Sequence, residues 1–321
     1  MRRLHCLLGA LLLVLLLLPL VLDKYLLGIF VMIFFYAYLG QAWNVLTGYT
    51  GHISLGHALY VGIGAYTSTY LAMNLGVTPW LGMIAGGLVA VVVALFLGFL
   101  GFRFGLRGVY FVILTISCAE IARLIVSHVP ALGGFAGIFL DYKPAVWNFQ
   151  FRGNIPYYYL SLGLMVSSVI AVRILERSRM GRFMVAVRED ESAAQALGVN
   201  SFKYSMMAIA ISAFMSALAG TFYANYIYYI NPHSVLGMGL SIELILRPII
   251  GGMGTALGPV VGSFILTPLS EISRAYFAKG GLEGLHLILY GLLAVLVVLF
   301  MRRGIVVYVK RALNPILRLE P

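Results

Sequence analysis

Apolar runs long enough to cross a lipid bilayer recur along almost the whole chain, and this feature limits the possible folds more than any other. A helix needs about 20 consecutive apolar residues to cross the bilayer's hydrocarbon core, which is ~30 Å thick. Hydrophobic residues make up 61% of the 321 residues and charged residues only 10%. We assign ten such segments, at residues 4–22, 25–46, 58–75, 80–101, 108–127, 156–175, 204–230, 241–256, 259–277 and 285–301. The sequence therefore predicts an all-α, polytopic transmembrane helical bundle of about ten spans, forming a single domain over residues 1–321.

The lysines and arginines are distributed unevenly between the two sides that these spans create. If residues 1–24 form a retained first helix with Arg2 and Arg3 in the cytoplasm, most of the 22 basic residues fall in cytoplasmic loops. This asymmetry agrees with the positive-inside rule. The formal net charge of +11 is thus explained by membrane topology. The polar segments carry no basic cluster with interleaved aromatic residues, so nucleic acid is not an expected partner.

Residues 176–203 form the most highly charged segment and must lie in water, because long apolar runs flank them. Within this segment, residues 188–198 are predicted to form a short helix. Asp190 is a suitable N-cap, and Gly198 supplies the left-handed residue that ends the helix. Small residues between these ends leave no bulky apolar stripe. Such a helix either docks into a partner or is an incidental turn in a solvated loop, and the spacing alone leaves both interpretations open.

Two glycine-rich segments interrupt the apolar runs, at residues 48–57 and 251–259. Glycine lets the backbone bend or pack closely, and irregular backbone at membrane depth is tolerated only where protein or a water-filled cavity surrounds it. Because the second segment follows Pro248, we expect the eighth span to be broken. These segments are candidates for a translocation path, although close helix packing explains them equally well. The candidate path residues here are Asn44, Gly48, Gly51, His52, Ser54, Gly56, His57, Gly251 and Gly254.

Three acid and base pairs lie inside predicted spans: Glu120 with Arg123, Glu243 with Arg247, and Glu271 with Arg274. Spacings of three and four residues place each pair on one helical face, where mutual neutralisation lowers the cost of burial. We expect the pairs to face the interior of the bundle. Glu120 and Glu243 join the candidate path residues, but structural pairing is the simpler explanation.

The sequence carries no recognisable enzyme motif. It lacks a G-x-S-x-G elbow, an H-E-x-x-H pair and a Walker sequence for ATP. His52 and His57 have no Cys, Asp or Glu near them in the sequence, which argues against a metal site, and Cys6 and Cys118 predict no disulfide framework. Any energy source must come from ions or from a partner, so no cofactor is expected in this chain.

From about Gly40 to Ile305 the chain resembles the membrane permeases of branched-chain amino acid ABC importers, of the LivM type. The resemblance rests on four blocks in a fixed order, at residues 44–58, 106–123, 178–198 and 241–259. The third block, which contains Ala186-Val-Arg-Glu-Asp-Glu-Ser-Ala-Ala-Gln-Ala-Leu-Gly198, matches most closely. The chain departs from the family's pattern at His52, where the family usually has Gln, and at Arg247, where it is normally apolar. It also departs at residues 302–305, where a Pro usually precedes the counterpart of the Arg-Gly pair.

The resemblance implies a role for residues 176–203 as a cytoplasmic coupling loop. It implies that this chain is half of a pore in a bacterial inner membrane, beside a second, LivH-like permease. It further implies two cytoplasmic ATPase subunits, which would bind the ATP, and an extracytoplasmic substrate-binding protein. The implied ATPase-coupling residues are Arg188, Glu189, Asp190, Glu191, Ala193, Ala194, Leu197 and Gly198.

Branched-chain amino acids (leucine, isoleucine and valine) are the expected substrates, with urea, short amides or other amino acids as alternatives. An ion-coupled secondary transporter is a second hypothesis, because membrane carboxylates such as Glu120 and Glu243 could couple transport to an ion gradient. A membrane-embedded enzyme is a third, and it would need a reactive cluster that the sequence does not offer.

Overall fold

A computed structural model describes residue 9 and residues 12–278, 291–292 and 304–306, with side chains of 274–278 excepted. Helices dominate this part of the chain. The main ones are α2 (Lys24–Trp43), α3 (His57–Leu75), α4 (Pro79–Arg103), α5 (Val109–His128), α6 (Asn154–Arg177), α7 (Arg179–Glu189), α8 (Glu191–Ala196), α9 (Ser201–Ile227), α10 (Pro232–Leu236), α11 (Met238–Gly251) and α12 (Gly258–Ala278). A π-helix, η2 (Asn44–Gly48), continues α2, and short 3-10 turns lie at Leu18–Leu20, Pro130–Leu132 and Gly134–Ala136.

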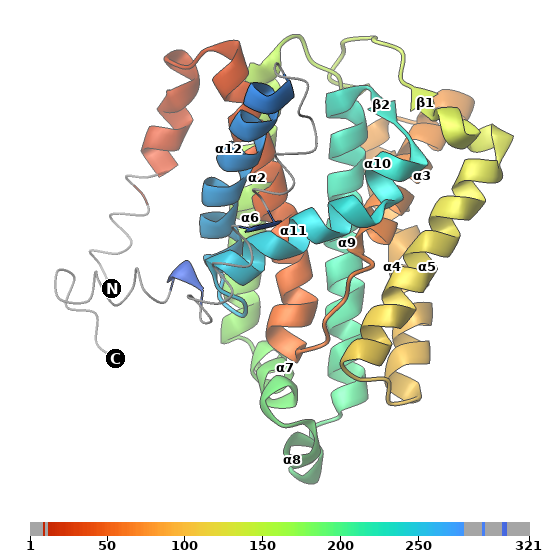
Figure 1. Ribbon diagram of the computed structural model, residues 1–321, viewed down its shortest axis with the longest axis vertical. Coiled ribbons are helices and arrows are strands. Elements are labelled where there is room, and N and C mark those ends of the chain that lie inside the picture. The colour runs from red at the N-terminus through yellow and green to blue at the C-terminus, as the bar shows by residue number, and fades with distance from the viewer. Residues whose placement is uncertain (1–8, 10–11, 279–290, 293–303, 307–321) are drawn as a thin grey trace.

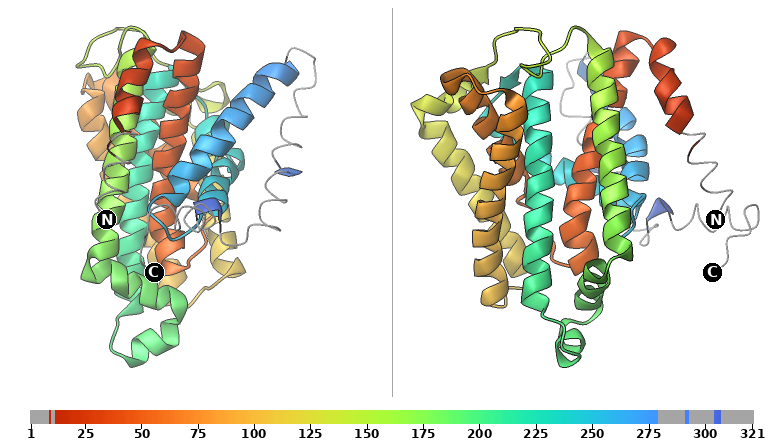
Figure 2. Two further views of the ribbon diagram at one scale, coloured as in Figure 1. Left: turned by 90° about the vertical axis from the view of Figure 1, so that its left-hand side faces the viewer. Right: turned by 180° about the vertical axis from the view of Figure 1, so that it is seen from behind.

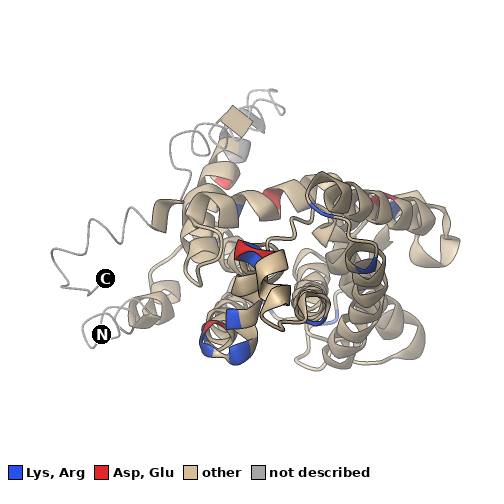
Figure 3. Ribbon diagram, turned by 90° about the horizontal axis from the view of Figure 1, so that it is seen from below, with Lys and Arg blue, Asp and Glu red and all other residues tan. Residues whose placement is uncertain are grey.

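The long helices run side by side between two ends of the molecule (Figure 1, Figure 2). We call these ends the α8 end and the hairpin end. The hairpin end carries strands β1 (Ile138–Phe139) and β2 (Tyr229–Ile230), which pair antiparallel with Ile138 opposite Ile230. The α8 end carries the charged segment that follows α6. Figure 3 shows the molecule from this end, with Lys and Arg in blue. The predicted helical bundle is therefore present, with a small two-stranded sheet that the sequence did not predict.

Six helical segments among the described residues are long and apolar enough to cross a membrane. They are Lys24–Gly48, Pro79–Arg103, Val109–His128, Asn154–Arg177, Ser201–Ile227 and Pro232–Gly251. The predicted spans at 58–75 and 259–277 form helices α3 and α12, which are not among these six. The predicted span at 285–301 lies largely outside the described residues, and the span at 4–22 is described only at residue 9 and residues 12–22. Polytopic helical architecture is thus confirmed, whereas a count of ten is not.

The predicted break in the eighth span is present. The chain bends between α10 and α11, and α11 then runs obliquely across its neighbours (Figure 1). Pro248 lies inside α11, which ends at Gly251 before an irregular connection to α12. A second irregular connection, residues 51–56, rises from the end of η2 to the start of α3 (Figure 1). Both glycine-rich segments therefore interrupt helices, as expected.

Close packing of α3, α4 and α9 builds the core beside the irregular connection at residues 51–56. A Cβ atom on Gly220 of α9 would lie 2.9 Å from the backbone nitrogen of Ala65. A Cβ atom on Gly86 of α4 would lie 3.1 Å from the Cα of Gly64 in α3. Small residues at helix contacts allow backbones in membranes to approach each other this closely. The three helices consequently form a dense unit against which the more irregular segments rest.

Candidate functional site

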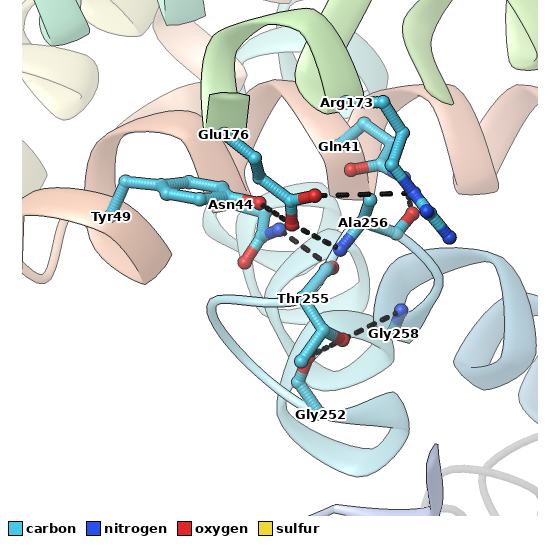
Figure 4. Close-up of polar contacts among 9 residues, drawn as sticks. All are labelled: Gln41, Asn44, Tyr49, Arg173, Glu176, Gly252, Thr255, Ala256 and Gly258. Atoms are coloured by element: carbon cyan, nitrogen blue, oxygen red, sulfur yellow. Dashed lines mark hydrogen bonds and ion pairs between the residues drawn. The ribbon is translucent and has the colours of Figure 1, made fainter. Parts of the chain in front are cut away.

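The two glycine-rich segments, far apart in the sequence, meet near the α8 end. We call residues 44–51 and 252–258 together the glycine junction. The side-chain oxygen of Asn44 accepts a hydrogen bond from the backbone N–H of Gly254 at 2.8 Å. The amide of Asn44 donates to the carbonyl of Thr255 at 3.1 Å, and Gln41 donates to the carbonyl of Ala256 (Figure 4). Side chains on one buried face of α2 and η2 thereby supply hydrogen-bond partners for backbone groups in the connection between α11 and α12.

Local backbone geometry explains why glycine occupies this junction. Gly51, Gly252 and Gly254 have φ values of +77°, +128° and +71°, a region that residues with a Cβ rarely adopt. A Cβ atom on Gly48 would lie 2.7 Å from the nitrogen of Gly254, too close for any side chain. The wider turn of the π-helix, of a kind often found at functional sites, brings Asn44 and Gly48 to the same contact. Here the close-packing interpretation of the glycines is confirmed.

Glu176, at the end of α6, ties the junction to the charged segment. Its Oε1 accepts hydrogen bonds from the Tyr49 hydroxyl at 2.5 Å and from the backbone N–H of Ala256 at 3.1 Å. Its Oε2 lies 3.9 Å from Nε of Arg173. Burial, and then the hydrogen bond to Glu176, raises the pKa of Tyr49 above its ordinary value, so the hydroxyl stays protonated and donates. Figure 4 shows the Glu176 carboxylate between Tyr49 and Ala256.

Arg188, from α7, makes a second tie to the junction. Its Nη1 donates to the carbonyl of Gly48 at 2.7 Å, and its Nη2 contacts Glu189 at 2.5 Å. Sequence reasoning assigned Arg188 to partner contact only, and it did not single out Glu176, Tyr49 or Gln41. The sequence offered one signal for Glu176: it is an acid at the end of an apolar run, three residues after Arg173. The charged segment and both breaks thus form one connected polar network.

The predicted short helix at 188–198 divides into two parts. Arg188 and Glu189 end α7, and Asp190 turns the chain and caps α8 by accepting from the N–H of Ala193 at 2.9 Å. Gly198 follows with φ +85°. The predicted N-cap and the predicted glycine end are therefore both confirmed, whereas continuity through Asp190 is not.

The predicted docking residues differ in accessibility. Ala194 is only 3% exposed and packs against the chain, whereas Leu197 is 85% exposed. Ala193 is exposed, and Glu191 forms an ion pair with Arg107 at 2.9 Å. Ala194 supports the fold of α8 from inside, so a partner at this surface would meet Leu197 and Ala193 instead.

The predicted path residues of segment 51–57 are held by hydrogen bonds between elements. His57 is fully buried, and its Nε2 lies 2.7 Å from the Ser212 hydroxyl of α9. Ser54 contacts Nδ1 of His57 at 3.1 Å, and its carbonyl accepts from the Trp43 indole at 2.8 Å. Gly56 packs directly on the backbone of Thr115 in α5. These residues fix the start of α3 against three neighbouring helices.

His52 lies in the same segment but faces a different environment. Its Nε2 lies 3.0 Å from the Ser205 hydroxyl, and its ring lies 4.5 Å from the ring of Phe102. Burial lowers the pKa of His52 to about 4, the nearby Glu191 opposes that shift and Arg107 reinforces it. The imidazole is therefore neutral at physiological pH.

The three predicted charge pairs have different surroundings. Arg247 is fully buried, with its guanidinium 3.4 Å from the ring centre of Tyr36 and 3.6 Å from the Glu243 carboxylate. Tyr36 donates to Glu243 at 2.6 Å, which satisfies that acid. This pair faces the interior, as predicted. The side chain of Arg274 lies outside the described side chains, so the third pair lies beyond the description.

Glu120 and Arg123 pair on α5, but the predicted interior orientation is wrong for the described chain. The Glu120 side chain is 45% exposed, and much of α5 is uncovered. Glu120 and Glu243 also do not join the glycine junction, which contains Asn44, Gly48, Gly51 and Gly254. Gly251 ends α11 beside that junction, where it packs on Gly258.

Six long apolar helices in the described part of the chain, interrupted by two backbone breaks, define a multi-pass membrane protein. The chain belongs to the family described as the permease component of branched-chain amino acid transport systems, whose sequence profile matches residues 25–299. Members of this family are transport components and not enzymes.

Individual relatives agree with that assignment. The high-affinity branched-chain amino acid transport system permease proteins LivM of Salmonella typhimurium and Escherichia coli are both 29% identical over 265 residues, covering 75% of this chain. The chain spans 62% of the length of these LivM relatives. The LivH permease protein of Escherichia coli is 28% identical over 287 residues, covering 84% of this chain and 90% of LivH. No solved structure matches the chain.

Proposed function

We propose that this chain is one of two permease subunits of an ATP-driven importer in a bacterial inner membrane. The observation that carries the proposal is the network in which Arg188 and Glu176 join α6 and α7 to both backbone breaks. A displacement of α7 would reach the glycine junction through the Arg188 guanidinium, and a displacement of the end of α6 would reach it through the Glu176 carboxylate. Coupling of this kind requires an element that a partner can bias between two arrangements.

Cytoplasmic ATPase subunits are the proposed partners at the α8 end. Leu197 projects from α8 and is almost fully exposed, which is unfavourable in water and typical of a residue that enters a pocket on another protein. Helix α8 is the outermost element at this end of the molecule (Figure 1), and Leu197 directly follows it. ATP would be bound and hydrolysed on those partners, and an extracytoplasmic binding protein would deliver substrate to the hairpin end.

A second permease is the proposed partner along α5. This helix is long and apolar, yet it carries the Glu120–Arg123 pair on an uncovered face. A charged pair facing lipid is costly, and such pairs in membrane helices normally face protein or a water-filled cavity. A LivH-like subunit packed against α5 would enclose the pair and complete a path between the two subunits.

Leucine, isoleucine and valine are the proposed substrates. The family description and the names of the LivM and LivH relatives all specify branched-chain amino acids. Among the described residues the interior charges are paired and the buried histidines are hydrogen-bonded, so no feature favours ion coupling over ATP. Uptake of radiolabelled leucine in cells that express the complete set of subunits tests the substrate.

Co-purification tests the proposed coupling surface. We expect the tagged wild-type chain to retain two ATPase subunits and the variant Leu197→Arg to lose them, because a large charge replaces the apolar contact. Leu75→Arg is the matched control, since Leu75 is 65% exposed at the hairpin end. Ala194→Arg is unsuitable, because its buried site would disrupt α8 itself.

The outcomes discriminate between the functional hypotheses. Loss of ATPases in Leu197→Arg but not in Leu75→Arg supports the importer. Wild-type protein that carries no ATPase would overturn the proposal and favour an ion-coupled carrier. Retention of the ATPases by Leu197→Arg would place the docking surface somewhere other than α8.

A further inference from the structure

A polar cavity of about 560 Å³ lies between the last turn of α4, the loop after it, α8 and the first turn of α9. Arg103 and Arg107 line it from the end of α4 and the loop after it, and Asn200 and Ser201 line it from the start of α9. Arg107 also pairs with Glu191, but its side chain remains 60% exposed. Arg103 has no hydrogen-bond or ion-pair partner among the residues that the structure describes. With two arginines against one acid, Glu191, the cavity lining carries a net positive charge.

An apolar stripe on α4 leads directly to this cavity. Leu88, Val92, Phe96 and Phe99 are all exposed, and their spacing places them on one helical face. Arg103 follows Phe99 by four residues, so the charge continues the same face one turn later. Phe202 of α9 packs beside Phe99 with ring centres 6.4 Å apart and also lines the cavity. Apolar surface and basic cavity thus form one continuous site.

We propose that this cavity binds the phosphate headgroup of an anionic phospholipid of the α8-side leaflet, with the acyl chains along the α4 stripe. Basic pockets between helices at the cytoplasmic membrane surface suit anionic headgroups, and each arginine near such a surface adds about fivefold in affinity. The α4 stripe distinguishes a lipid from a free anion, because inorganic phosphate would gain nothing from it. It also favours lipid over an ATPase, because Phe99, the last residue of that apolar stripe, itself lines the cavity.

Lipid retention by the full chain tests this proposal without any requirement for transport. Purified protein in detergent micelles is titrated with dioleoylphosphatidylglycerol or dioleoylphosphatidylcholine, and bound lipid is counted by native mass spectrometry. We expect preferential retention of one phosphatidylglycerol. Arg103→Gln should weaken that binding about fivefold. Arg182→Gln is the matched control, because Arg182 is exposed on α7 at the same end but does not line the cavity.

Further measurements separate a lipid from other occupants. Phe99→Ser should weaken phosphatidylglycerol binding, and excess inorganic phosphate should not displace the lipid. Effective displacement by inorganic phosphate would overturn the lipid assignment in favour of a free-anion site. If Arg103→Gln and Arg182→Gln weaken lipid binding equally, the binding depends only on general surface charge, and the proposal is overturned. Loss of lipid binding when ATPase subunits are attached would assign the cavity to the ATPase interface instead.

Discussion

Tyr49 and Glu176 show how much of the network depends on single atoms. The Tyr49 hydroxyl, one residue after η2, donates to the Glu176 carboxylate at the end of α6, and the same carboxylate oxygen accepts from the backbone N–H of Ala256. Hydrogen bonds to charged groups contribute about 1.5–3 kcal/mol to stability. A change that removes only this hydroxyl therefore measures the tie between the two elements.

We expect Tyr49→Phe to lower the free energy of unfolding by about 2 kcal/mol and to reduce uptake at unchanged expression. Denaturation by sodium dodecyl sulfate in mixed micelles measures the stability. Tyr110→Phe is the control, because Tyr110 is 72% exposed and removal of its hydroxyl should change little. Equal stability of the two variants would show that the Tyr49 hydrogen bond carries no net energy.

His52 gives the chain a defined response to acid. The imidazole has a pKa of about 4 in the folded chain and 6.5 as its ordinary value, so the unfolded chain binds the proton more readily between these values. Its contribution to stability is full above pH 6.5 and is lost as the pH falls from 6.5 toward 4. We expect His52→Gln, which can keep a hydrogen bond to Ser205, to lose less stability over that range. Melting temperatures of both proteins from pH 7.5 to 4.5 check this, and parallel curves would contradict it.

At the scale of elements, glycines set how closely α3 and α9 approach. A Cβ atom on Gly220 would collide with the backbone of Val61 and Ala65, which cannot move aside as a side chain can. We expect Gly220→Ala to destabilise the protein by about 1–3 kcal/mol. Gly163→Ala in α6 is the matched control, because a Cβ atom there meets nothing within 4 Å. That change should be neutral or stabilising by up to about 1 kcal/mol, and melting temperatures of both variants distinguish the cases.

Sequence reasoning predicted most of the helices because apolar length is a local property. Asp190 as an N-cap and Gly198 as a helix end were also predictable, since caps depend on neighbouring residues. The contact between Asn44 and Gly254 was not predictable from one sequence, because nothing local to either residue specifies a partner 210 positions away. The inward orientation of Ala194 was missed for the same reason, since tertiary packing decides which side of a short helix is buried.

At the scale of the whole molecule, the uncovered face of α5 is the proposed contact surface for the second permease. We expect a photo-crosslinking amino acid at Ile121, which is exposed on α5, to crosslink to the second permease in membranes. The same amino acid at Val92, on the α4 stripe, should not crosslink to it. Denaturing gels with an antibody against each subunit provide the measurement. Crosslinking from both positions or from neither would contradict the assignment of α5 to the subunit interface.

The meeting of η2 with the connection before α12 also has a consequence for synthesis. Asn44 and Gln41 leave the ribosome 210 and 215 residues before the backbone groups that they contact. At about 5–20 residues per second, translation of that interval takes roughly 10–40 s. Throughout that time both amides lack these native partners. Chains that end before Gly254 therefore lack the backbone groups that pair with both amides, which leaves two polar side chains without these partners at membrane depth, where water cannot replace them.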